Sequence, residues 1–527
     1  MLHKMTFQSL LNKGMKRFGE MPAITLLPAG ETITYDELWK KTELITSYLL
    51  RLGAGRGVRI ATIIPNSLES VMFGLAIQQC GATLVPLSEK LGKREIQFIL
   101  KEAKPEVVII ATQTHFDTIF EYLEEMKKED VHVIGLPGFH IDYPEEFEQF
   151  QWPGEPGEIN NLDLPLAEEE DIALLSYTGG TTGTPKGVMH SQKGLGAAIL
   201  SAAIEDPLDD RDRVLLSTPI VHSAGSLLWR SLVSGVHVYV MGSFDAAAFI
   251  QAIKEHEITT TFMVPTMLYR LLDQTKKMEY DMSSMRNIFY GASPISQKRL
   301  KEAFEVFGPI MRQQYGMTEC NIVITRLSKS AHVWAYQNNS EILKSCGKPC
   351  ILTEVRLIDE DGNDVKPTEL GEIIVKSPAM MVGYYQRPDL TQEYIRDGWF
   401  YTGDIGKWDE SGYLYIVDRK KDMIITGGMN VYSSEVERVV NQHPSVALSA
   451  CIGVPHPDWG EVVCVVVSPR EGSNCTSEEV IDFCKQRTSK YMVPKVAYFL
   501  DKFPITPIGK IDKKELRKMF SQGILTI

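Results

Sequence analysis

At 527 residues the chain is too long for one compact core, so we expect several domains. Hydrophobic residues make up 44% and charged residues 23% of the chain, an ordinary composition for a globular protein. The net charge of −13 argues against a protein that coats nucleic acid, because phosphate neutralisation needs clustered Lys and Arg. A nucleotide ligand stays open, since a few local donors and one metal ion can hold a small anion.

The N-terminus and the cysteines bear on the compartment of the protein. Residues 1–20 have apolar residues at helical spacing interrupted by Lys and Arg, and they lack the continuous core of a signal peptide. No apolar run approaches the roughly 20 residues that span a bilayer. Cys346 and Cys350 are the closest pair of cysteines, but no second pair or His cluster completes a zinc site. We therefore expect a cytoplasmic protein with reduced thiols and no transmembrane segment.

Short apolar strands alternate with amphipathic helices from about residue 58 to residue 314. The segment 59–65 predicts a buried strand, and the segment 67–79 predicts the helix after it. Such alternation predicts an α/β fold with parallel sheets covered by helices on both faces. Residues 137–170 are rich in Pro, Gly and acidic residues and predict a surface connection.

The pattern changes twice in the last third of the chain. After Cys346, closely spaced strands with Asp-Gly turns at 361–362 and 397–398 predict a mainly β segment. A charged strip at 418–421 then precedes a self-sufficient α+β pattern, which is typical of a linker or hinge. Ser434 and Glu437 have the spacing of a capping box and predict a helix start at that point.

The segment after the apolar strand at 172–176 combines glycine, threonine and lysine. In order, its residues are Thr178, Gly179, Gly180, Thr181, Thr182, Gly183, Thr184, Pro185, Lys186 and Gly187. Glycines let backbone N–H groups approach phosphate oxygens, while the threonines add hydroxyl donors and the lysine adds charge. The pattern predicts a phosphate-binding loop, with a flexible surface loop as the alternative. It is neither a Walker A loop nor the dinucleotide fingerprint, because glycines are missing from the required positions and Gly187 follows the lysine.

This loop resembles the signature of the adenylate-forming superfamily, which contains acyl- and aryl-CoA synthetases, firefly luciferase and the adenylation domains of peptide synthetases. Further motifs follow in that family's order, so the resemblance covers nearly the whole chain. They are GASP at 291–294, QYGMTE at 314–319, WFYTGD at 399–404, DRKKD at 418–422 with the glycine pair at 427–428, and PIGKID at 507–512.

The resemblance implies a division of the chain and an activity. Residues 1–417 would form a large N-terminal domain of two helix-covered sheets plus a β-barrel-like subdomain. A hinge at 418–421 would join it to a small, mobile α+β C-terminal domain at 422–527. The implied enzyme is an acyl-CoA synthetase, with the fatty-acid–CoA ligase branch first, and its cofactors and co-substrates are ATP, Mg²⁺ and coenzyme A.

The motif residues suit the activation of an acid by ATP. Attack of a carboxylate on the α-phosphate gives a mixed anhydride, and negative charge gathers on the phosphoryl oxygens, so catalysis needs positioning and cationic groups. Glu319 offers the kind of oxygen ligand that Mg²⁺ prefers, and Thr318 can hydrogen-bond phosphate. Tyr315 can stack on adenine, and Asp404 offers two acceptors for ribose hydroxyls. For Glu319 and Asp404 the alternative is a turn or a helix cap.

Other residues of the same motifs complete the predicted nucleotide site. Arg419 is a second ribose or phosphate donor, and Lys421 occupies the family's hinge position, from which it can also contact the nucleotide. The predicted nucleotide-binding residues outside the loop are Gly291, Ala292, Ser293, Gln314, Tyr315, Gly316, Met317, Asp404, Arg419, Lys421, Gly427 and Gly428.

Lys510 is the predicted main catalyst of adenylation, because it can bridge the incoming carboxylate and the α-phosphate. A lone lysine so near the chain end is ordinarily a solvated side chain, but the complete motif series favours catalysis. The resemblance implies that the C-terminal domain then rotates about the hinge and withdraws Lys510. Gly427 and Gly428 would enter the site instead, where backbone without side chains suits a narrow pantetheine passage.

The acyl pocket is predicted from the segment after Pro219 and from neighbouring motifs. His222, Gly225, Trp229 and Val264 are its candidate residues, and His222 has a satisfied core histidine as its alternative. Residues 219–233 contain no acidic side chain to hold an ammonium group, which disfavours an amino acid as substrate. A medium- or long-chain fatty acid is the first prediction, and an aryl or cyclic acid is the next.

The predicted partners are thus a small carboxylic acid, ATP and coenzyme A, with no nucleic acid. An acyl-AMP ligase that loads a separate carrier protein and a non-catalytic nucleotide-binding regulator stay open, as do both a monomer and a homodimer. The chain ends 17 residues after Lys510, which leaves no space for a fused carrier domain and favours coenzyme A as the acceptor.

Lys510→Ala should abolish acyl-adenylate formation and leave thioester formation from supplied acyl-AMP largely intact, because the lysine is needed only while pyrophosphate departs. Pyrophosphate exchange and single-turnover thioester formation measure the two half-reactions separately. Equal loss of both would refute this division of labour.

Overall fold

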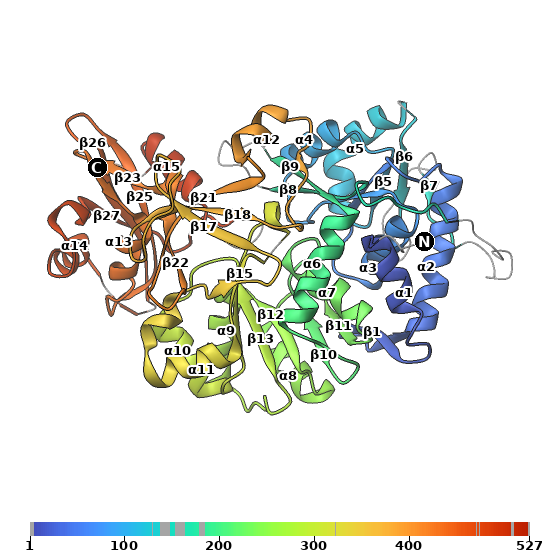
Figure 1. Ribbon diagram of the computed structural model, residues 1–527, viewed down its shortest axis with the longest axis horizontal. Coiled ribbons are helices and arrows are strands. Elements are labelled where there is room, and N and C mark those ends of the chain that lie inside the picture. Colours follow the sequence, from blue (N-terminus) through green and yellow to red (C-terminus); the bar gives the residue numbers. More distant parts are fainter. Residues whose placement is uncertain are drawn as a thin grey trace. The chain divides into compact units, whose positions relative to one another are not determined.

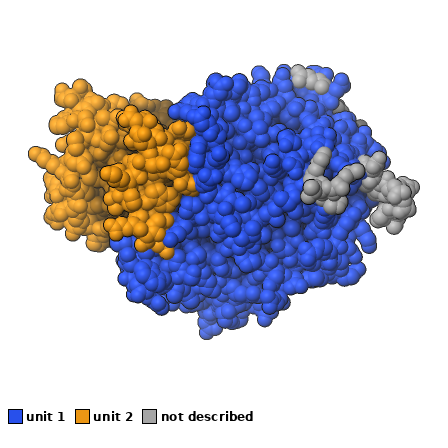
Figure 2. All heavy atoms as spheres, viewed as in Figure 1, with its two compact units in different colours: residues 1–354, 375–400 blue, residues 355–374, 401–527 orange. Residues whose placement is uncertain are grey.

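The computed structural model describes residues 5–128, 130–136, 148–152, 164–178, 185–321, 323–470, 472–473, 475–506 and 511–524. The chain divides into two compact units, residues 1–354 with 375–400 and residues 355–374 with 401–527 (Figure 2). Domain boundaries at residues 417 and 422 stay predictions. The predicted site residues that lie outside the described set are Gly179, Gly180, Thr181, Thr182, Gly183, Thr184 and Lys510.

Among the described residues, nine strands of the first unit form one sheet in the order β16-β15-β14-β13-β12-β10-β11-β1-β2 (Figure 1). The neighbours from β14 to β1 are parallel, as the alternation of strands and helices predicts. The strands are β1 (Pro22–Leu27), β2 (Glu31–Thr34), β10 (Arg213–Leu216), β11 (His237–Met241), β12 (Thr260–Met263), β13 (Asn287–Gly291), β14 (Met311–Tyr315), β15 (Thr325–Leu327) and β16 (Lys348–Pro349).

A second sheet of the first unit has, within the described ranges, the order β19-β9-β8-β4-β3-β5-β6-β7. Its strands from β8 to β7 are parallel neighbours, whereas β8, β9 and β19 pair antiparallel. The strands are β3 (Arg59–Ile63), β4 (Thr83–Pro86), β5 (Val107–Ile110), β6 (His132–Gly135), β7 (Glu148–Gln149), β8 (Ile172–Thr178), β9 (Lys186–Ser191) and β19 (Gly383–Tyr384).

Helices between the two sheets build the main core of this unit. They are α1 (Phe7–Met15), α2 (Tyr35–Arg51), α3 (Leu68–Gln79), α6 (Gln192–Glu205) and α7 (Ser223–Val233), and they share one buried cluster with strands of both sheets. Helix α3 is apolar on nearly all sides and buries ten of its twelve residues, as expected for a helix enclosed by two sheets.

The outer faces carry amphipathic helices, which bury only one side. Helices α4 (Lys93–Ala103) and α5 (Gln113–Lys128) pack on the second sheet, where α4 buries Ile96, Ile99, Leu100 and Ala103 at helical spacing. The first sheet carries α8 (Ala246–His256), α9 (Pro265–Thr275) and α10 (Gln297–Phe307), and α11 (Lys329–Asn338) and α12 (Pro388–Tyr394) complete the unit (Figure 1). The predicted α/β class is confirmed. No helix in the described ranges is both long and apolar enough to cross a membrane.

The last third of the chain forms two smaller sheets. The first has the order β17-β18-β21-β20, with β22 paired to β21, and its strands are β17 (Glu354–Ile358), β18 (Gly371–Lys376), β20 (Ile395–Arg396), β21 (Trp399–Trp408) and β22 (Leu414–Arg419). The second has the order β24-β23-β26-β25, with β27 paired to β26. Its elements are β23 (Ile424–Thr426), β24 (Met429–Val431), α13 (Ser433–Val440), β25 (Val446–His456), β26 (Gly460–Pro469), α14 (Ser477–Lys485), β27 (Val496–Phe499) and α15 (Lys513–Ser521).

The capping box predicted at Ser434 and Glu437 is wrong, although a helix starts one residue earlier, at Ser433. The Ser434 hydroxyl donates to the carbonyl oxygen of Val417 on β22. The Glu437 carboxylate accepts the backbone N–H of Cys451 at 2.7 Å and pairs with the Lys513 ammonium at 2.7 Å. Partners distant in sequence therefore replace the local cap.

Lys513 joins α15 to α13 at this point, because its Nζ also donates to the Ser433 hydroxyl at 2.8 Å. Asp418, at the end of β22, accepts the backbone N–H of Ser434 at 3.2 Å on the other side. Burial raises the pKa of Glu437, and the Lys513 charge opposes that shift. The cluster ties β22, which ends inside the predicted hinge segment, to α13 and α15 of the second unit.

Lys513→Met should lower the free energy of unfolding of the second unit by about 3 kcal/mol, because it leaves the Glu437 carboxylate buried without its cation. Urea unfolding measures the change. Lys514→Met, at the exposed neighbouring position, is the matched control and should change stability by less than about 0.5 kcal/mol. An equal effect of both variants would contradict the role of the pair.

Candidate active site

Neighbouring parallel strands of the first sheet bring predicted residues to one edge. The carboxyl ends of β10, β12, β13 and β14 lie side by side, since these strands are consecutive and parallel. His222 follows β10 and Val264 follows β12. Gly291 ends β13 and residues 292–293 follow it, while Tyr315 ends β14 and residues 316–319 follow it. In open α/β sheets, ligands bind beyond this edge. The structure therefore places the candidate acyl and adenine residues on adjacent connections.

The turn after β13 requires a close approach of two backbones. Gly291 lies opposite Gln314, and a Cβ at Gly291 would stand only 2.3 Å from the carbonyl oxygen of Gln314. The next residue, Ala292, has a φ of +67°, a conformation that costs energy for a residue with a side chain. The chain thus turns sharply where the adenine-side motif was predicted, and Ser293 follows that turn.

The second sheet supplies both ends of the predicted phosphate loop. Thr178 ends β8 and Lys186 begins β9, and the two residues are opposite each other in the antiparallel register. Pro185 is described and half-buried. The flanks of the loop are therefore fixed by a strand pair.

The motif at the end of β14 is held against this strand pair by backbone hydrogen bonds. Thr318 and Glu319 begin a short 3₁₀ helix, η2 (Thr318–Cys320), and Gly316 and Met317 connect it to β14. The carbonyl oxygen of Glu319 accepts the N–H of Met381 at 2.8 Å. The next residue, Val382, donates its N–H to Met189 of β9 at 2.8 Å. Residues from both sheets thus meet around η2.

Two tyrosine rings hold the Lys186 side chain beside this motif. Its Nζ lies 5.3 Å from the ring centre of Tyr384 and 4.8 Å from that of Tyr394. The two rings meet edge to face at 5.7 Å. The Tyr384 hydroxyl donates to Oε1 of Glu319 at 3.1 Å. The sequence did not single out either tyrosine, because neither belongs to one of the motifs and aromatic residues are ordinarily packing residues.

The Glu319 carboxylate fits the role of a magnesium ligand. Mg²⁺ prefers one or two carboxylates together with substrate phosphates and water over an all-protein cage. The described residues contain no cluster of three or more His, Cys, Asp or Glu side chains that could hold a metal ion by itself. Glu319 is half-buried and has no Lys, Arg or His as an ion-pair partner among those residues.

Helix α7 presents the candidate acyl residues on one face, since His222, Gly225 and Trp229 are spaced at i, i+3 and i+7. A Cβ at Gly225 would lie 3.7 Å from the Trp229 Nε1, but only 2.3 Å from the carbonyl oxygen of Ile220, so the backbone also demands glycine there. Burial lowers the pKa of His222 to about 4, and its buried Nε2 has no hydrogen-bond partner within the described set. A satisfied core histidine would have one.

The Trp229 indole extends from this face towards α3 and α1. A Cβ at Gly74 would stand 2.9 Å from the indole Cη2, so the ring fills the space that this glycine leaves. Phe7 meets the indole edge to face at 6.2 Å. The ring is therefore fixed by both helices.

The remaining predicted residues belong to the second unit. Asp404 on β21 is opposite Arg419 on β22, and its buried carboxylate lies 3.3 Å from the Arg419 Nε. Lys421 belongs to η4 (Lys420–Asp422). Gly427 and Gly428 form the turn between β23 and β24, with φ values of +56° and +78°. Glycine is favoured at both positions by this geometry alone.

Comparison with known proteins identifies the family of the chain. Residues 11–385 match the model of the AMP-binding enzyme family, and residues 435–510 match that of the AMP-binding enzyme C-terminal domain. The chain belongs to the AMP-binding enzyme family. The adenylate-forming resemblance of the sequence is confirmed.

Similar proteins cover nearly all of this AMP-binding enzyme. A medium/long-chain-fatty-acid–CoA ligase, FadD8, of Mycobacterium tuberculosis is 34% identical, over 98% of this chain and 90% of the relative. A feruloyl-CoA synthase of an Amycolatopsis species is also 34% identical, over 93% and 94%. The amide bond synthetase McbA of Marinactinospora thermotolerans matches in structure with a TM-score of 0.85 and 28% identity, over 97% and 99%.

The family and its curated relatives identify the class of reaction. The protein is an AMP-forming acid–thiol ligase. Its cofactor and co-substrates are Mg²⁺, ATP and coenzyme A. The relatives are named for different acids, namely fatty acids, ferulate and succinylbenzoate, so they identify the reaction and not the acid.

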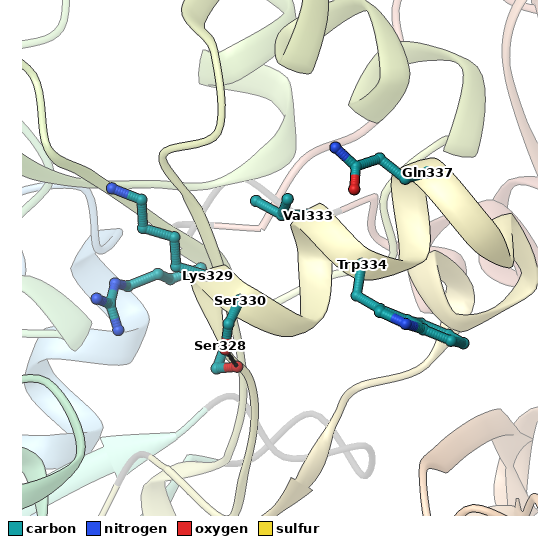
Figure 3. Close-up of a pocket in the computed structure, with 7 residues that line it drawn as sticks. Ser328, Lys329, Ser330, Val333, Trp334 and Gln337 are labelled. Atoms are coloured by element: carbon teal, nitrogen blue, oxygen red, sulfur yellow. Dashed lines mark hydrogen bonds between the residues drawn. The ribbon is translucent and has the colours of Figure 1, made fainter.

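A surface pocket of the AMP-binding enzyme lies away from these residues. It is lined by the start of α11, with Ser328, Lys329 and Trp334, and by Arg312 (Figure 3). Arg312 is the second residue of β14, whereas the motif at 314–319 lies at the other end of that strand. The pocket is therefore at the amino end of the strand and is not part of the candidate site.

Proposed function

We propose that this AMP-binding enzyme joins an apolar carboxylic acid, with a medium- or long-chain fatty acid first, to coenzyme A. In the first step the acid and ATP give acyl-AMP and pyrophosphate. In the second step acyl-AMP and coenzyme A give acyl-CoA and AMP. The proposal rests mainly on one observation. The segments that contain His222, Gly291 and Glu319 leave the same end of neighbouring strands in one sheet, and Tyr384 contacts both Glu319 and Lys186 there.

Adenylation requires two anions to approach each other. Lys186 and the Thr178 hydroxyl flank the loop that would bind the phosphates, and Thr318 would add a hydrogen bond. The Glu319 carboxylate would hold Mg²⁺, which supplies positive charge to the phosphoryl oxygens. Tyr315 and residues 291–293 would bind adenine, while Asp404 and Arg419 would bind ribose. Lys510 would position the carboxylate against the α-phosphate.

The thiol step has a different electrostatic demand. The coenzyme A thiol attacks the acyl carbonyl, an oxyanion forms, and AMP leaves with the electron pair of the broken anhydride bond. Pyrophosphate has already left, so the charge that Lys510 balanced is gone. We infer that the turn at Gly427 and Gly428 then contributes a narrow backbone surface for the pantetheine arm.

The apolar character of the candidate pocket supports an uncharged acyl group. Gly225, Val264 and Trp229 offer no charge, and the half-buried His222 is neutral at neutral pH because burial of its ring lowers its pKa to about 4. The one cation on α7, Arg230, is buried, packs on the Phe289 ring and donates to the Ala202 carbonyl oxygen at 3.1 Å. An aryl or cyclic acid is the second candidate, and the feruloyl-CoA synthase relative favours it.

A panel of carboxylic acids tests the proposal directly. Purified protein with Mg²⁺ and ATP should release pyrophosphate and form AMP only when a suitable acid is present, and turnover should require coenzyme A. Fatty acids of graded length and a set of aryl acids rank the two candidates. Pyrophosphate release that does not depend on coenzyme A would point to a carrier-protein acceptor. Absence of turnover with every acid would contradict the proposal.

Trp229→Ala should shift the preferred fatty acid towards longer chains, because removal of the indole opens the end of the pocket. Each further methylene that the pocket buries is worth about 0.8 kcal/mol, so kcat/KM for acids a few carbons longer should rise about tenfold or more. The measurement is kcat/KM across the graded series, with Trp334→Ala, at the distant surface pocket, as the control. An unchanged profile would show that Trp229 does not line the acyl pocket.

A further inference from the structure

Lys186 and Glu319 carry opposite charges on segments that hydrogen bonds hold side by side, yet they do not form an ion pair. Met381 donates to the Glu319 carbonyl oxygen, and the following Val382 donates to β9, the strand that begins at Lys186. In the part of the chain that the structure describes, neither side chain has a salt-bridge partner within 4.0 Å. A lysine has the reach to pair with a carboxylate on such a neighbouring segment. The Lys186 ammonium lies instead against the rings of Tyr384 and Tyr394.

Tyr384 contacts both charged groups. The face of its ring attracts the Lys186 ammonium, and its hydroxyl donates to Oε1 of Glu319 at 3.1 Å. The side chain is only 3% exposed and is fixed in the β19–β9 pair, where Tyr384 is opposite Val188. Tyr394 adds a second ring to the lysine at 4.8 Å. One rigid side chain thus sets the positions of a cation and an anion.

The two contacts have separate chemical consequences. The hydroxyl satisfies one oxygen of the Glu319 carboxylate without neutralising its charge, so the carboxylate stays a metal ligand. Burial and the nearby Glu319 charge raise the pKa of Tyr384, which keeps the phenol protonated as a donor. The ring holds the ammonium by its quadrupole, which leaves the N–H groups of Lys186 available to phosphate oxygens.

We propose that Tyr384 is a positioning residue that keeps Lys186 and Glu319 from neutralising each other, so that the lysine serves the phosphates and the glutamate serves Mg²⁺. This inference rests on the proposed function, because it takes the ATP phosphates and their metal ion to be the ligands of these two side chains.

The metal dependence of ATP binding tests the proposal without catalysis. Isothermal titration calorimetry measures the affinity of the intact protein for ATP in Mg²⁺ and in EDTA, with no acid present. Tyr384→Phe removes the hydroxyl and keeps the ring. In this variant the factor by which Mg²⁺ raises the affinity for ATP should fall about tenfold, as expected for loss of a hydrogen bond to a charged group. Its affinity for ATP in EDTA should stay within about twofold of that of the unaltered protein.

The second ring provides an independent variant. Tyr394→Leu removes one face of the lysine cage and leaves the hydroxyl bond to Glu319, so ATP affinity should fall by similar factors in Mg²⁺ and in EDTA. Tyr48→Phe is the matched control, since the Tyr48 hydroxyl donates to the carboxylate of Glu148 at a site on α2 and β7. It should change neither affinity. Thermal melting of each variant checks that the fold is intact.

Glu319→Gln separates failure of this inference from failure of the proposed function. Suppose that Mg²⁺ no longer raises the ATP affinity of Glu319→Gln but still raises that of Tyr384→Phe as in the unaltered protein. This result would overturn the positioning role of Tyr384 and leave the assignment of Glu319 to the metal site standing. Retention of the gain in Glu319→Gln would remove Glu319 from the metal site, and the proposed arrangement would fail with it. A selective loss in Mg²⁺ for Tyr394→Leu would also contradict the separation of the two contacts.

Discussion

The repulsion between a carboxylate and a triphosphate is the constraint on which this protein depends. Both reactants are anions, and the chain as a whole carries a net charge of −13, so attraction must be local. We propose that this attraction is concentrated at the carboxyl ends of the parallel strands of the first sheet, where the segment 381–382 bonds η2 on one side and β9 of the second sheet on the other. Positive groups in such a place are useful only if they stay unpaired until the substrate arrives. The contacts of Tyr384 with Lys186 and Glu319 meet that requirement.

Much of the fold was predictable because it follows from short-range patterns. Strand β5 is wholly apolar and β3 buries four of its five residues, as central parallel strands do, and α3 is apolar on nearly every side. The motif order also predicted that residues 291–293 and 314–319 act together, and the parallel register of β13 and β14 brings them to one edge. The two motifs can lie so close because Gly291 has no Cβ, which allows its backbone to approach the backbone of Gln314.

What the sequence did not predict depends on contacts between distant segments. Tyr384 and Tyr394 had no distinguishing pattern, and their importance appears only when β19 pairs with β9. The capping box at Ser434 was wrong because Val417 and Lys513, distant in sequence, offered better partners to Ser434 and Glu437. A local rule fails where tertiary contacts supply more favourable bonds. The roles of Asp404, Lys421 and Lys510 in the nucleotide site stay predictions.

In the acyl-adenylate mechanism an oxygen of the acid attacks the α-phosphorus of ATP. The most direct measurement starts from an accepted acid labelled with ¹⁸O in its carboxylate and follows the label by mass spectrometry after complete conversion to the thioester. The account predicts one labelled oxygen in AMP and none in pyrophosphate. Label in inorganic phosphate with formation of ADP would show attack at the γ-phosphorus instead, and the acyl-adenylate mechanism would be contradicted.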